Sequence, residues 1–171
     1  MGQTTDKRNS HVVLAIFANG RGFGLAVMKD ALSLIDAYMV TLKYRPVANK
    51  HLIEKLKEKI DYYKPDVVIL EEPTGYGSRK GKRVHKFIDS VRQHTKSVGL
   101  KVYSYSRNDI RFVFSNFNAS SKFEIANVIC ENIPELEKRR PEKRKYYQSE
   151  QYSMSIFDAV SLGITHYYHS E

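Results

Sequence analysis

The sequence is poor in cysteine and has no long apolar run. Its 171 residues include one cysteine, Cys130, which excludes an internal disulfide framework and fits a reducing compartment. No stretch approaches the roughly 18 consecutive apolar residues of a membrane span, and the polar residues 2–10 lack the apolar core of a signal peptide. We therefore expect a cytoplasmic protein with no membrane association.

Acidic residues are also scarce relative to basic ones. Nineteen Asp and Glu stand against 28 Lys and Arg, giving a net charge of +9. Such a surface attracts polyanions, of which nucleic acid is the commonest. A basic domain without a nucleic-acid role stays open on charge alone. The length and the 42% hydrophobic content predict a flexible leader over residues 1–10 and one domain over residues 11–171.

Three strand-like segments open the domain. Residues 11–17 are almost wholly apolar, which predicts a buried strand. A glycine-rich turn over residues 19–22 leads into a second apolar segment at 23–28, and residues 35–42 form a plausible third strand. We expect an antiparallel meander. The glycine-rich turn precedes a strand and not a helix, so it indicates a hairpin in preference to a phosphate-binding loop.

Helices and strands then alternate. Asn49 is positioned to cap a helix over residues 50–63 that Pro65 ends, and residues 67–70 and 101–106 predict two further strands. Between those strands, a loop over 73–83 precedes a helix that ends near Gly99 with these apolar residues on one side: Val84, Phe87, Ile88, Val91 and Val98.

Two more helices complete the chain. Ser121 and Glu124 have the spacing of a capping box, and Cys130 lies on the apolar side of the helix that follows. A basic connector over residues 138–145 precedes the last helix, at about 155–167. This order predicts an α/β protein with an RNase H-like three-layer fold: a mixed five-stranded sheet with helices on both faces.

Three motifs resemble those of the RuvC-type Holliday junction resolvases, a family of the RNase H-like superfamily, and the similarity extends from about His11 to His166. The motifs are the hairpin at residues 16–28 with Arg21 and Gly24, the strand 68–71 ending in Glu71, and the helix 157–166 beginning near Asp158. The resemblance implies a homodimer that acts on branched DNA, with Glu71 and Asp158 as catalytic residues that bind Mg (or Mn). Glu72, the second of two consecutive acids at the end of the strand, is a substitute metal ligand.

The chain departs from the family at two of four acidic positions. Phe17 stands where the first strand carries the family's central aspartate, and Ser155 stands three residues before Asp158 where another acid is expected. Two magnesium ions about 4 Å apart normally share a carboxylate ligand, and a phenyl ring cannot supply it. Asp36 or Asp109 would have to fold into the vacancy to replace it.

Three functions therefore stay open. The chain is a weakened metal-dependent endonuclease on branched DNA, a catalytically inactive DNA-binding or assembly module, or a protein-interaction domain. Glu71 also has an ordinary interpretation as a solvated strand-end acid, and Asp158 has one as part of a Ser155 capping box at the helix N-terminus. The six histidines lack metal-type spacing, and His166 is interpreted as a helix-end residue.

Basic residues near the proposed site are candidates for DNA contacts. An exposed connector or a solvated basic loop is the alternative for most of them, and Tyr146 and Tyr147 would be available to stack on bases. The predicted nucleic-acid-binding residues are Arg21, Lys80, Lys82, Arg83, Lys86, Lys122, Lys143 and Arg144.

Overall fold

The computed structural model describes residues 11–72, 80–143, 145 and 153–169. The predicted leader, residues 73–79 of the 73–83 loop, Arg144, Tyr146 and Tyr147 lie outside these residues.

The five predicted strands form one mixed sheet in the order β3-β2-β1-β4-β5. The central strand β1 (Val13–Asn19) pairs antiparallel with β2 (Gly22–Asp30) and parallel with β4 (Val67–Glu71). Strand β3 (Ser33–Thr41) continues the antiparallel half, and β5 (Lys101–Tyr105) continues the parallel half. The meander and the mixed sheet predicted from the sequence are both confirmed.

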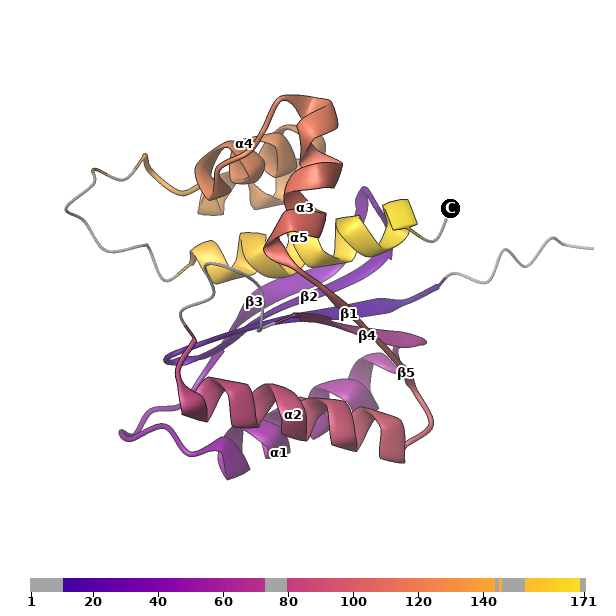
Figure 1. Cartoon of the computed structure of the whole chain (residues 1–171), viewed down its shortest axis with the longest axis vertical. Coiled ribbons are helices and arrows are strands. Elements are labelled where there is room, and N and C mark those ends of the chain that lie inside the picture. Colours follow the sequence, from indigo (N-terminus) through magenta and orange to yellow (C-terminus); the bar gives the residue numbers. More distant parts are fainter. Residues whose placement is uncertain (1–10, 73–79, 144, 146–152, 170–171) are drawn as a thin grey trace, which may run out of the picture.

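Helices cover both faces of this sheet (Figure 1). Helices α1 (Asn49–Tyr63) and α2 (Lys82–Ser97) lie on one face. On the other face α5 (Met154–His169) lies along the sheet, while α3 (Arg107–Phe114) and α4 (Lys122–Asn132) lie beyond it. Because α5 is enclosed between the sheet and the outer helices, it is buried from Met154 to His166. The three-layer arrangement is confirmed.

Alternation along the central strands divides the core in two. Val13, Ala15 and Phe17 belong to the core on the α5 side, whereas Leu14 and Ile16 belong to the core on the α1–α2 side. Both faces of β1 and β4 are covered, which explains why their sequences are continuously apolar and not alternating.

Within the described residues, one α-helix was not predicted from the sequence, and neither were two short 3-10 helices at Ser115–Phe117 and Pro134–Arg139. Helix α3 has eight residues and begins at a capping box. Ser106 Oγ accepts a hydrogen bond from the Asp109 backbone N–H, and the Asp109 carboxylate accepts one from the Ser106 backbone N–H. The capping box predicted at Ser121 and Glu124 is present at the start of α4.

Three details of the predicted helices were wrong. The N-cap of α1 is Ala48, and Asn49 is instead the first helical residue, with its side chain bonded to Arg83. Val98 is 51% exposed because α2 ends at Ser97. Ser155 is not a cap of α5: it lies in the buried first turn.

None of the helices within the described residues is long and apolar enough to cross a membrane.

Candidate functional site: two acids paired with lysines

The two acids predicted as site residues lie on the same side of the sheet. Glu71 is the last residue of β4, and strand alternation directs it to the α5 side together with Ile69. Asp158 lies in the second turn of α5, which packs on that side. Both are buried, with exposed fractions of 8% for Glu71 and 3% for Asp158.

Phe17 belongs to the core on the same side of the sheet, and two lysine ammonium groups lie over its ring. The ring centroid is 3.9 Å from Lys80 Nζ and 5.1 Å from Lys122 Nζ. Both distances are within the range of cation–π attraction. Phe17, at the position of the family's central aspartate, therefore contacts cations through the π face of its ring and not through a carboxylate.

Each lysine also pairs with one of the acids. Lys80 Nζ is 3.2 Å from Glu71 Oε2, and Lys122 Nζ is 3.2 Å from Asp158 Oδ2. We call Phe17, Glu71, Lys80, Lys122 and Asp158 the lysine–acid cluster. The structure thus brings Glu71 and Asp158 into one site, and the site contains its own positive charges.

Lys80 is held almost entirely inside the protein. Only 11% of its side chain is exposed, and Nζ also donates a 2.6 Å hydrogen bond to the Ala18 carbonyl. Desolvation lowers the pKa of Lys80, an effect that Glu71 and Asp158 oppose. Glu71 Oε2 is buried and accepts no well-aligned hydrogen bond from the described residues, so the Lys80 ammonium at ion-pair distance is its counter-charge.

Asp158 contacts a second cation that sequence reasoning missed. Arg107 Nη1 is 3.7 Å from Asp158 Oδ1, whereas Lys122 Nζ is 3.2 Å from Asp158 Oδ2. Arg107 is the first residue of α3, as Lys122 is of α4. The spacing of Ser106 and Asp109 repeats the capping pattern of Ser121 and Glu124, and this signal would have located both basic residues at helix starts.

A neutral hydrogen bond occupies the position of the second missing acid. Asn19 Nδ2 donates to Ser155 Oγ at 2.8 Å, which joins the β1–β2 hairpin to the first turn of α5. The Asn19 side-chain oxygen accepts from the backbone of Arg21 and Gly22, so it also shapes the turn.

The donor set does not fit a two-metal centre. Among the described residues no three His, Cys, Asp or Glu side chains are grouped to hold a metal ion. Asp109 is used in the cap of α3, and Asp36 accepts a 2.8 Å hydrogen bond from the Tyr63 hydroxyl, so neither replaces the acid absent at Phe17. Glu72 is half-buried directly after Glu71, with its backbone N–H bonded to the Tyr105 carbonyl.

The predicted DNA-binding residues fall into two groups. Lys80, Arg83 and Lys122 have internal partners, and the Arg83 guanidinium donates to Asn49 Oδ1 and to the Asn19 carbonyl. Desolvation, aided by Arg45, lowers the pKa of Arg83. Exposed side chains belong to the remaining described members: Arg21, Lys82, Lys86 and Lys143.

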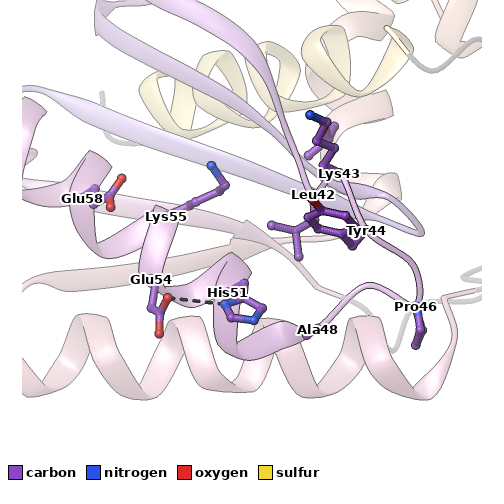
Figure 2. Close-up of a pocket in the computed structure, with 10 residues that line it drawn as sticks. Leu42, Lys43, Tyr44, Pro46, Ala48, His51, Glu54, Lys55 and Glu58 are labelled. Atoms are coloured by element: carbon purple, nitrogen blue, oxygen red, sulfur yellow. Dashed lines mark ion pairs between the residues drawn. The ribbon is translucent and has the colours of Figure 1, made fainter.

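A separate open pocket of about 710 Å³ lies where β3 leads into α1 (Figure 2). Its walls include Leu42, Tyr44 and Pro46, and an exposed ion pair joins His51 and Glu54 at 3.5 Å. Because α1 covers the opposite face of the sheet from α5, this pocket is distinct from the lysine–acid cluster.

His166 lies in the last turn of α5, which agrees with its interpretation as a helix-end residue, and it is buried there. Its Nδ1 is 2.9 Å from the Tyr105 hydroxyl, its Nε2 is 3.4 Å from His11 Nε2, and only 3% of it is exposed. Burial, together with the neighbouring His11 and His169, lowers the pKa of His166 to about 4.

Comparison with known proteins identifies the fold through solved structures. No protein-family model and no curated protein sequence matches the chain. Thermus thermophilus RuvC matches with a TM-score of 0.65 and 16% identity over 93% of this chain and 95% of that one. The same enzyme in complex with a Holliday junction gives a TM-score of 0.64 and 17% identity over 93% of this chain and 94% of that one.

Two further resolvases match less closely. The yeast mitochondrial Holliday junction resolvase has a TM-score of 0.56 and 11% identity, over 91% of this chain and 78% of that one. The Fowlpox virus resolvase in its junction complex has a TM-score of 0.51 and 14% identity, over 92% of this chain and 99% of that one. The chain therefore has the RNase H-like fold of the RuvC-type Holliday junction resolvases.

Proposed function

We propose that this protein binds branched DNA and does not cut it. The observation that carries this proposal is the lysine–acid cluster, in which Phe17 replaces a metal-binding acid and each remaining acid is paired with a lysine. The proposal makes the catalytically inactive module the preferred function among the three that the sequence left open.

The fold and the charge support DNA binding. The structures that match include two resolvases in complex with Holliday junction DNA. Exposed cations lie on two elements near the lysine–acid cluster: Arg21 on the β1–β2 hairpin and Lys82 in the first turn of α2. The Arg83 bond to the Asn19 carbonyl holds these two elements together. Lysine and arginine side chains on one end of a basic protein are suited to phosphate contacts.

The cluster opposes hydrolysis for two reasons. Two-metal cleavage needs a carboxylate shared between the ions, and Phe17 lies at that position. Each remaining carboxylate already has an ammonium group 3.2 Å away, so a divalent ion would have to displace a lysine and come close to a like charge. A single weakly held ion on Glu71 and Asp158 is the basis of the competing function, a weakened endonuclease.

A homodimer follows from the same proposal. A four-way junction has two-fold symmetry about its branch point, and a two-fold symmetric pair of subunits would match that symmetry. Light scattering should give the mass of two chains for the protein alone, or of two chains plus the DNA for the junction complex. A mass of one chain for the protein alone and of one chain plus the DNA for the complex would contradict this part of the proposal.

The direct test uses a labelled four-way junction, a linear duplex and a single strand, each incubated with magnesium, manganese or chelator. We expect preferential junction binding without products, weakening at least about tenfold between 50 and 200 mM salt because bound phosphates release counterions. Products that disappear in Glu71→Gln would establish the weakened endonuclease. Weak binding that is indifferent to salt would remove nucleic acid from the function and leave the protein-interaction domain.

A further inference from the structure

Asp158 is a buried carboxylate with a cation on each oxygen. Lys122 Nζ lies 3.2 Å from Oδ2, and Arg107 Nη1 lies 3.7 Å from Oδ1. The exposed fractions of the side chains are 3% for Asp158, 19% for Arg107 and 29% for Lys122. The carboxylate is therefore inside the protein, while both cationic side chains reach toward solvent.

The two cations come from separate helices with fixed starting points. Each is the first residue of its helix, and a complete capping box fixes the first turn of both α3 and α4. The third member belongs to α5, which packs directly on the sheet. Because three elements meet at Asp158, the separation of the Arg107 and Lys122 side chains is set by the fold and not by flexible loops.

The chemistry of this trio suits an anion better than a metal ion. Its two cations and one carboxylate carry one net positive charge, which repels a divalent cation and attracts a phosphate. A guanidinium group binds phosphate oxygens through directed hydrogen bonds, and an ammonium group adds a compact point charge. Lys122 also lies over the Phe17 ring, which keeps its ammonium group at this site.

We propose that Arg107 and Lys122 together bind one phosphate of the DNA backbone without a metal ion, and that Asp158 is the positioning residue that holds them. The proposal rests on the proposed function and deepens it by naming the binding site and the ligand chemistry. It also gives Asp158 a role different from the metal ligand that the sequence predicted.

The test compares junction affinity in chelator for the wild-type protein, Arg107→Gln, Lys122→Gln and the control Lys57→Gln. Lys57 is an exposed residue of α1, on the opposite face of the sheet, and its substitution removes the same charge. We expect each site variant to weaken binding about five- to tenfold and to reduce the slope against log salt by about one, with less than about a twofold change for the control. Magnesium should change wild-type affinity by less than about twofold at constant ionic strength.

The outcomes separate this inference from the proposed function. If the wild-type protein binds the junction and both site variants bind as tightly, the phosphate site is wrong while the DNA-binding function stands. If the wild-type protein fails to bind, the proposed function fails. If magnesium strengthens wild-type binding about tenfold and Asp158→Asn removes that gain, Asp158 is a metal ligand and the inference is overturned.

Conservative variants keep the test valid if a glutamine variant does not fold. Arg107→Lys and Lys122→Arg retain the charge that holds Asp158, and circular dichroism establishes that they are folded. We expect Lys122→Arg to bind within about twofold of wild type and Arg107→Lys to lose about threefold, because an ammonium group lacks the planar fork. Equal affinity for Arg107→Lys and wild type would contradict directed binding by the guanidinium group.

Discussion

Lys80 lies in surroundings that are unusual for a lysine. It is nearly enclosed, contacts the Phe17 ring, and uses its ammonium group for the Ala18 carbonyl and Glu71. Burying an ammonium group costs free energy unless a counter-charge is close, and Glu71 supplies it. Lys80 and Glu71 therefore depend on each other, and the stability of the site depends on the pair.

Replacing Lys80 alone should be costly. Lys80→Met leaves Glu71 buried without its counter-charge, and we expect a loss of about 3 kcal/mol in the free energy of unfolding measured with urea. The double variant Lys80→Met with Glu71→Leu should recover most of that loss. The control Lys86→Met, on an exposed position of α2, should stay within about 0.5 kcal/mol of wild type. A single variant as stable as wild type would show that the pair contributes nothing.

The site was only partly predictable at the level of residues. Glu71 and Asp158 could be found because each lies in a recognisable motif, and the structure brings them together. The lysine pairing could not be predicted, because Lys80 and Lys122 reach the acids through tertiary packing that no local pattern records. Arg107 was missed together with its helix, whose eight residues give only one apolar stripe, formed by Ile110, Val113 and Phe114.

Among the elements, α5 is the one whose placement positions the site. It carries Asp158 and Ser155, and it lies so close to β2 that a side chain on Gly24 would collide with it. A Cβ at Gly24 would lie 2.1 Å from the Ser155 carbonyl oxygen, which is backbone and cannot rotate away. Glycine is required here by close approach and not by backbone conformation.

Gly24→Ala should therefore displace the start of α5. We expect a loss of about 3 kcal/mol in the free energy of unfolding, because the overlap can be relieved only by moving backbone. Gly20→Ala in the same hairpin is the matched control, since a Cβ there has no atom within 4 Å. Thermal unfolding of both variants gives the comparison, and equal melting temperatures would contradict the close packing of α5 on β2.

The strands were predicted more reliably than their ends. Their continuous apolar runs reflect burial on both faces of the sheet, which any sequence reading can detect. The ends depend on pairing: β1 extends to Asn19 because Asn19 pairs with Gly22 across the hairpin. Likewise, asparagine often caps a helix, but the Asn49 side chain is hydrogen-bonded to Arg83, 34 positions further along the chain.

At the scale of the whole molecule, His166 joins three distant parts of the chain. It contacts His11 before β1, Tyr105 at the end of β5, and the rest of α5 in which it is buried. His169 and the Tyr103 ring are also close to it. Burial, followed by the neighbouring His11 and His169, disfavours the charged imidazolium and lowers the pKa of His166.

The protein should lose stability as the pH falls from about 6.5 toward 4. In this window the unfolded His166, with its ordinary pKa of 6.5, binds a proton that the folded residue, with a pKa of about 4, does not bind. The loss reaches at most about 3 kcal/mol at the lower end and is absent above pH 6.5. Urea unfolding across this range measures it.

His166→Phe should flatten that pH dependence, since the ring is kept and the titrating group is removed. His51→Gln, on the exposed start of α1, should leave it unchanged. An unaltered dependence in His166→Phe would assign the effect to other groups.

Asn19, in the β1–β2 hairpin, is hydrogen-bonded to a helix on each face of the sheet. Its amide reaches Ser155 on α5, and its carbonyl receives Arg83 from α2. The two helical layers are thus fastened to one backbone unit at the end of the sheet that carries the acids. Neither layer can slide along the sheet at that end without breaking a bond to Asn19, so a force on one helical layer is transmitted through Asn19 to the sheet and to the other layer.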